Sequence, residues 1–278
     1  MTRKTFGALL TAAFIIASAE ASFGGAWTAP QGSFYEKLAY NYYSSDENFS
    51  SSGGRVRTPN NGKFTDYDVN NYFEYGLTND LTVITSLTYK WLKNEGDTFH
   101  VRADSLGDAD LGLRYKLLDG KAGILSTQLL VKIPGAYGRN DPLPLGNGQL
   151  DTEVRLLYGR SLYPHIPGYA NVEAGYRWRA DGPADEFRYL IEVGVDIPGN
   201  FFTRAKLDGI LSMNNGKKTN GTINPTATYN YDLGKLDLTV GYKISPWWGV
   251  EVGYRPDLFG RNIAAGANYS MALYFKTL

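Results

Sequence analysis

Long segments in which polar and apolar residues alternate are the feature that most constrains this fold. Between residues 107 and 118, every second side chain is apolar, and the intervening positions are mostly charged or glycine. Successive side chains of a β-strand point to opposite faces of the sheet, so a period of two indicates strands with one apolar face and one ionic face. The same pattern recurs in the segments 151–159, 171–179, 186–196 and 262–276.

The length of these segments distinguishes a membrane barrel from a soluble β-sandwich. They span about ten to thirteen residues, whereas a soluble strand has about five or six and a tilted bilayer-crossing strand needs about 9 to 11. Aromatic residues at the ends of apolar faces, such as Tyr89 and Trp91, suit the aromatic girdles of membrane barrels. We therefore predict an all-β chain that forms a single antiparallel up-and-down transmembrane β-barrel, with a soluble exported β-sandwich as the alternative.

The strand count follows from the number of alternating segments. The sequence contains twelve: 33–47, 64–77, 80–93, 105–118, 122–134, 149–162, 169–180, 185–197, 201–213, 225–244, 247–258 and 263–276. Tight connections alternate with long ones at 48–63, 94–104, 135–148 and 214–224, as expected for short periplasmic turns and long outer loops. The apolar parity changes near Gly234, which we interpret as a bulge within one long strand. Fourteen strands with different boundaries is the alternative.

The first residues predict a secretory signal peptide. Arg3 and Lys4 precede an apolar run from Phe6 to Ile16, and small residues follow. This run is too short to cross a bilayer as a helix, so we expect residues 1–21 to be a cleaved leader and residues 22–278 to form the barrel. The predicted location is the outer membrane of a Gram-negative type cell, with outer-membrane lipid around the barrel.

Composition excludes several classes of function. The chain has no cysteine, which rules out disulfides, thiolate metal sites and a cysteine nucleophile. Its 28 basic and 28 acidic residues balance, so no basic surface for nucleic acid is expected. The only histidines, His100 and His165, lie in predicted loops with no serine placed beside them, which argues against a hydrolase. The sequence therefore predicts no enzyme activity, no cofactor and no metal site, and it identifies no protein partner.

Several short segments resemble a known family. They are Gly107–Leu118, Lys132–Gly135, Gly146–Asp151, Gly175–Arg179, Pro183–Glu186 and Gly260–Asn262. Together, over roughly residues 105–278, the sequence resembles the barrel family called MetA-pathway of phenol degradation. This resemblance implies an outer-membrane transporter or porin, with aromatic compounds as expected solutes. One departure is that Phe275 is followed by three further residues, whereas such barrels often end in an aromatic residue.

Alternation assigns the ionic side chains to the barrel interior, where water or a partner charge can satisfy them. The predicted lumen is charged but balanced, with about fourteen acids and fourteen bases on inward faces. The candidate solute-pathway residues are Lys90, Asp108, Asp110, Arg114, Lys132, Asp151, Glu153, Arg155, Glu173, Arg177, Arg179, Glu186, Arg188, Glu192 and Arg204.

Two interpretations of these charges remain open. Folding the hairpins about their loops predicts the ion pairs Lys90–Asp108, Lys132–Asp151 and Arg179–Glu186, which would hold the wall together. Alternatively, acids on 64–77 and 105–118 face bases on 169–213 across the bore and would orient a solute by a transverse field. The predicted function is accordingly a channel or facilitator for small polar or aromatic solutes. The alternative is a non-enzymatic structural or envelope-assembly barrel whose lumen is sealed by ion pairs.

Overall fold

A computed structural model describes residues 25–217 and 224–277 of the chain. The predicted signal peptide, residues 1–21, lies outside the described residues. Among the described residues, no helix has both the length and the apolar character needed to cross a membrane.

Twelve long strands form the wall of the molecule. They are β1 (Phe34–Phe49), β3 (Lys63–Gly76), β4 (Leu81–Gly96), β6 (Ala109–Gly120), β7 (Gly123–Ile133), β8 (Asp151–Ser161), β9 (Gly168–Arg179), β10 (Glu186–Ile197), β11 (Phe201–Ser212), β12 (Asp232–Lys243), β13 (Trp248–Arg261) and β14 (Ile263–Lys276). Two further strands, β2 (Arg55–Arg57) and β5 (Phe99–Leu106), pair with β1 and β4 outside this ring.

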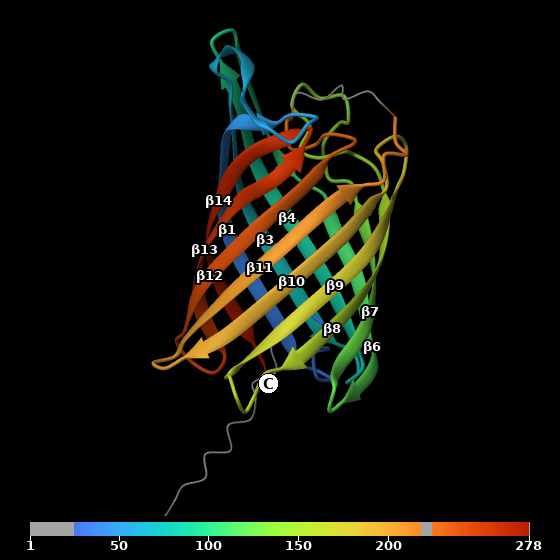
Figure 1. Ribbon diagram of the computed structural model, residues 1–278, viewed down its shortest axis with the longest axis vertical. Helices are drawn as coiled ribbons and strands as arrows, with labels where there is room; N and C mark the ends of the chain where they lie inside the picture. The colour runs from blue at the N-terminus through green and yellow to red at the C-terminus, as the bar shows by residue number, and fades with distance from the viewer. Residues whose placement is uncertain (1–24, 218–223, 278) are drawn as a thin grey trace, which may run out of the picture.

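The wall is a closed antiparallel barrel. Each wall strand pairs with the next one along the chain, and β14 pairs with β1 to close the ring. The strands are strongly tilted, and the longest loops gather at one end (Figure 1). The predicted all-β, up-and-down barrel of twelve strands is confirmed.

The two faces of each strand have the chemistry that alternation predicts. On β6, the outward Leu113 is 44% exposed, whereas the adjacent inward Arg114 is 3% exposed. Outward aromatic pairs lie toward the outer ends of two strands: Tyr89 and Trp91 have ring centroids 4.7 Å apart, and Tyr176 and Trp178 have centroids 5.0 Å apart. An apolar exterior with aromatic residues near its edge is the surface of a barrel that faces lipid.

One predicted outer loop is instead a β-hairpin. Residues 94–104 were expected to be a long loop, but β4 continues to Gly96 and pairs with β5 from Tyr89 onward. Only the first part of β4, from Leu81 to Ser86, pairs with β6. The alternation in this region belongs to a hairpin that extends beyond the barrel wall, and it carries the same period of two as the wall strands.

A second correction concerns the segment 225–244. It is not one long strand, because β12 begins only at Asp232 and residues 225–231 lie in turns and bends. A register shift does occur between Gly234 and Lys235 in the pairing with β13. The extra residue of this shift is Leu258 on β13, and β12 itself pairs with β11 without a shift. The change of parity therefore marks the end of a loop and not a bulge at Gly234, and the strand count stays at twelve.

Candidate functional site

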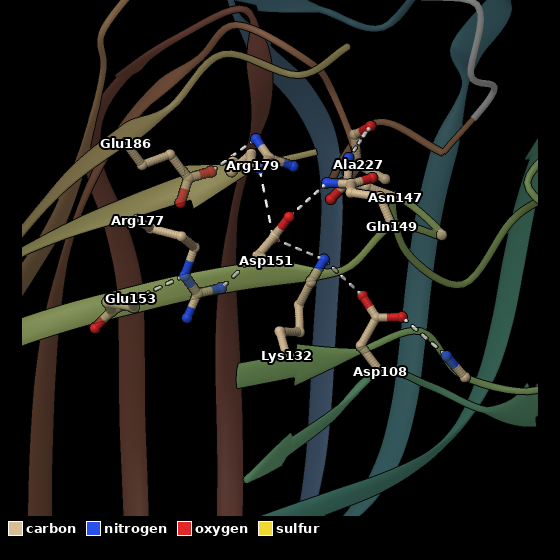
Figure 2. Close-up of polar contacts among 12 residues, drawn as sticks. Asp108, Lys132, Asn147, Gln149, Asp151, Glu153, Arg177, Arg179, Glu186 and Ala227 are labelled. Carbon is tan, nitrogen blue, oxygen red and sulfur yellow. Dashed lines mark hydrogen bonds and ion pairs between the residues drawn. The ribbon is translucent and has the colours of Figure 1, made fainter. Parts of the chain in front are cut away.

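A chain of ion pairs crosses the inner wall at the outer ends of β7 to β10. The Lys132 ammonium lies 3.1 Å from a carboxylate oxygen of Asp108 and 2.9 Å from one of Asp151 (Figure 2). Arg179 continues the chain, with Nε 3.6 Å from Asp151 and Nη1 2.8 Å from Glu186. Asp151 on β8 joins the two parts of this chain, because it contacts Lys132 on β7 and Arg179 on β9.

A second tier of charges lies immediately below this chain. Glu153 is fully buried and accepts from Nε of Arg177 at 2.8 Å. Its other oxygen lies 2.5 Å from Arg155, which also reaches Glu173 at 2.5 Å. Arg188 lies 3.6 Å from Glu153. Each of these arginines therefore has at least one carboxylate partner, and this half of the wall is compensated at short range.

The periplasmic end of the same half is filled by an N-terminal strap, residues 25–33. The backbone amide of Ala26 donates to Asn171 on β9, and the Ser126 hydroxyl on β7 donates to the Ala26 carbonyl. Trp27 packs edge-on against Tyr169 at 5.6 Å between ring centroids. Side chains of β7 and β9 thus hold the strap inside the lumen.

The strap is also tied to a deeply buried ion pair. Arg114 forms a two-pronged contact with Glu74, each hydrogen bond being 3.2 Å long, and donates to the Trp27 carbonyl at 2.9 Å. The backbone amide of Ala29 donates to the Thr82 hydroxyl at 2.8 Å. The strap was not predicted from the sequence, because it precedes the first alternating segment and has no polar–apolar periodicity of its own.

The outer mouth is partly filled by the loop between β7 and β8, residues 134–150. Leu143 and Leu145 of this loop are buried against Phe64 and Leu92 on the inner wall. The Tyr137 hydroxyl donates to Asp108 at 2.5 Å. Burial, together with this contact to a carboxylate, raises the pKa of Tyr137, so the phenol stays protonated and the loop is tied to the ion-pair chain.

The opposite half of the lumen is more open. Lys37 on β1 and Lys206 on β11 keep 28% and 26% of their side-chain surface accessible. These side chains point inward, so this accessible surface faces the interior. Neutral and acidic groups line the neighbouring wall: the Asn268 amide donates to Asn41, whose amide donates to Asp68. One half of the lumen is therefore packed and the other is lined by accessible polar groups.

Two of the three ion pairs predicted from the hairpins are confirmed, namely Lys132–Asp151 and Arg179–Glu186. The third, Lys90 with Asp108, is wrong. Lys90 pairs with Asp66 at 2.6 Å, and Asp108 pairs with Lys132. The reason is β5, which occupies the place beside the upper part of β4 where β6 was expected.

Three other predicted lumen residues, Arg204, Glu192 and Asp110, are not part of the two tiers of ion pairs described above. Arg204 lies 2.6 Å from Glu251, and Glu192 accepts from the Tyr169 hydroxyl at 2.5 Å. One buried oxygen of Asp110 has no hydrogen-bond partner among the described residues. Their use as a solute pathway stays a prediction.

The histidines differ in position. His100 lies on β5, not in a mobile loop, and its Nδ1 is 3.3 Å from Glu95. His165 lies in the turn between β8 and β9, as expected. Among the described residues, no group of three or more His, Cys, Asp or Glu side chains is arranged to hold a metal ion.

Comparison with known proteins identifies the fold. No protein-family model matches the sequence, and no curated protein sequence is detectably similar to it. Among solved structures, the chain is similar to the COG4313 outer membrane channel from Pseudomonas putida F1. The TM-score is 0.75 with 14% sequence identity, covering 91% of this chain and 98% of that one.

Two other barrels are similar at lower scores. The translocator domain of the autotransporter NalP from Neisseria meningitidis has a TM-score of 0.53 and 12% identity, covering 90% of each chain. The NanC porin has a TM-score of 0.51 and 12% identity, covering 88% of this chain and 100% of the porin. The chain therefore shares the closed antiparallel β-barrel fold of these outer-membrane proteins, as the resemblance in its sequence implies.

Proposed function

We propose that this barrel is a passive outer-membrane channel for small polar or aromatic solutes. The observation that carries the proposal is the accessible polar half of the lumen, where inward-facing side chains such as Lys37 and Lys206 retain about a quarter of their surface. Lys37 and Lys206 form only long ion pairs, at 3.8 Å to Glu251 and 3.5 Å to Asp237. A barrel built only as a sealed wall would cover these groups more completely, since buried polar groups are stabilising only when they are fully paired.

The similarity to the Pseudomonas channel supports the proposal at the level of the fold. That protein is described as an outer membrane channel, and its chain is covered almost completely by this one. A twelve-strand barrel lies between the filled eight-strand and the open sixteen-strand case, so the bore is expected to be narrow. Narrowness combined with a polar lining favours small solutes and offers no pocket for long apolar chains.

A structural barrel with a sealed lumen is the second candidate. It is favoured by the compensated charges on β8 to β10, where Asp151, Glu153 and Glu186 are each no more than 2% exposed. The strap and the loop 134–150 also fill parts of both mouths. This candidate requires that the open half conduct nothing.

Solute flux across the open half distinguishes the two candidates. Asn41 faces this half on β1, whereas the adjacent Tyr40 faces lipid and is 44% exposed. In liposome-swelling assays with arabinose and benzoate, Asn41→Trp should strongly reduce entry of both solutes, because the larger side chain narrows the accessible half. Tyr40→Trp is the matched control and should swell at the wild-type rate.

The solute preference follows from the same lining. Cationic and tyrosine side chains suit small aromatic acids, which pair with a cation and stack on a ring. We expect benzoate-like solutes to enter faster than alkanes or long-chain fatty acids. Equal swelling by wild type and Asn41→Trp would place the flux elsewhere, and no swelling by wild type would favour the sealed barrel.

A further inference from the structure

Two lumen-facing cations on the open half stand apart from the ion pairs described above. Lys235 lies on β12 and Arg255 on β13. Both are half-buried, and their faces are opposite to those of the exposed Leu238 and Tyr254. Lys235 is in register with Asp257, which is two residues from Arg255 on the same face of β13. The two cations are therefore diagonal neighbours on adjacent strands.

Neither cation has a charged partner in contact. Among the described residues, no carboxylate oxygen lies within 4.0 Å of the Lys235 ammonium or the Arg255 guanidinium, and neither group donates a hydrogen bond to the protein. A side-chain nitrogen that has no hydrogen-bond partner is either fully buried or in contact with the lumen. The nitrogens of Lys235 and Arg255 are not among the fully buried ones, so they are in contact with the lumen. Like charges held this close without compensation repel each other.

The carboxylates on the flanking strands are already engaged. Asp257 accepts hydrogen bonds from the Tyr43 hydroxyl and the Gly266 amide, both at 2.9 Å. Asp237 pairs with Lys206 at 3.5 Å and accepts from Thr239 at 3.0 Å. These contacts hold both carboxylates against the wall and away from the two cations.

Asp208 on β11 is the remaining carboxylate beside this pair. It is directly opposite Lys235 in the register of β11 and β12, yet lies more than 4.0 Å from the ammonium group. Among the described residues, Asp208 and Asp257 have no cation within 4.0 Å, so they balance the two cations by long-range attraction only. The charged nitrogens of Lys235 and Arg255 remain without a contact partner in the lumen.

We propose that Lys235 and Arg255 form a binding subsite for a small organic monoanion, with a carboxylate as its recognised group. A planar guanidinium matches a carboxylate with two parallel hydrogen bonds, and a neighbouring ammonium adds a third charged donor. A single carboxylate can accept hydrogen bonds from both groups at once, so a monoanion suffices to satisfy them. This inference rests on the proposed channel function, for which it names the class of solute.

The arginines of β8 to β10 are poorly suited to this role. A solute carboxylate approaching Arg177 or Arg179 would have to displace Glu153 or Glu186, which are held within 2.8 Å and are almost completely buried. Binding there would break a buried ion pair, which is unfavourable even though Arg155 still contacts Glu153 and Arg188 still contacts Glu186. Lys235 and Arg255 require no such displacement.

The test is a binding titration that does not depend on conduction. Purified barrel in detergent is titrated by calorimetry with benzoate and with benzamide, its neutral analogue. We expect wild type to bind benzoate and not benzamide, and Lys235→Gln and Arg255→Gln each to weaken benzoate binding about tenfold or more, since each removes charge-assisted hydrogen bonds. Lys116→Gln is the control, because that lysine is paired with Asp80 at 3.1 Å and with Asp119 at 3.2 Å, and it should bind as wild type does.

Lys235→Arg keeps the charge and should retain binding, which excludes misfolding as the cause of a loss in Lys235→Gln. Equal affinity for benzamide, equal weakening by Lys116→Gln, or no benzoate binding by wild type would each overturn the subsite. Channel function is scored separately by arabinose flux. A wild-type protein that passes arabinose but does not bind benzoate would refute this inference and leave the proposed function intact.

Discussion

Removing the Arg114 side chain should be strongly destabilising, because it leaves a fully buried carboxylate behind. Glu74 is 0% exposed and receives two hydrogen bonds from Arg114, each 3.2 Å long. Breaking a buried ion pair by removing one partner costs about 3–5 kcal/mol. Arg114 also donates to the Trp27 carbonyl and to Gln128, so Arg114→Gln should lower the free energy of unfolding by an amount in the upper part of that range.

The double variant separates lost hydrogen bonds from the unpaired charge. Arg114→Gln combined with Glu74→Gln removes both charges, and the two amides can still form neutral hydrogen bonds that contribute about 0.5–1.5 kcal/mol each. The double variant should therefore be more stable than Arg114→Gln alone. Equilibrium unfolding in urea, followed by tryptophan fluorescence in liposomes, measures each free energy. If the losses of the two single variants simply add in the double variant, the pair is not coupled and this reasoning is refuted.

Three further predictions concern other parts of the wall. Leu113→Arg should cost about 2–4 kcal/mol in the same unfolding assay, since it puts a charge on the lipid face at mid-strand; a cost no larger than that of Leu113→Ala would contradict the assigned face. Gly194→Ala should be more destabilising than Gly112→Ala. An added Cβ would lie 2.3 Å from the Tyr169 ring at Gly194, but 3.2 Å from its nearest neighbour at Gly112. Equal unfolding free energies for the two variants would show that the Tyr169 ring moves aside freely. Burial raises the pKa of Asp185, but hydrogen bonds from the Arg179 amide and two side chains outweigh it and hold this pKa below 3.8. The ionised carboxylate therefore stabilises the folded protein above about pH 4, and this stabilisation is lost as pH falls through the lowered pKa. The drop in melting temperature between pH 5 and pH 3 should be smaller in Asp185→Asn than in wild type, and an unchanged drop would exclude the stabilisation.

Much of the fold could be predicted because alternation is a direct consequence of strand geometry. Every wall strand has a lipid-facing apolar series, and all twelve predicted segments correspond to wall strands. The errors arose where periodicity does not report the partner strand. The hairpin of β4 and β5 alternates as the wall does, and only its pairing shows that it extends beyond the barrel.

The candidate site was predicted less completely. Pairs on adjacent strands, such as Lys132 and Asp151, follow from register and were found. The cover over Gly194 by the ring of Tyr169 was not predicted, because it depends on the rotamer of a side chain on the neighbouring strand. The strap was missed because it has no period of its own. Lys235 and Arg255 were missed because the sequence does not show which carboxylates are already bonded to other groups.

Single-channel conductance of the purified barrel in a planar bilayer tests the channel account most directly. Wild type should show small discrete ion currents through the open half of the lumen. Trp27→Ala should raise them, because the strap loses its packing against Tyr169 at the periplasmic mouth. A complete absence of current in both proteins, with both running as folded heat-modifiable barrels, would contradict the channel and establish the sealed wall.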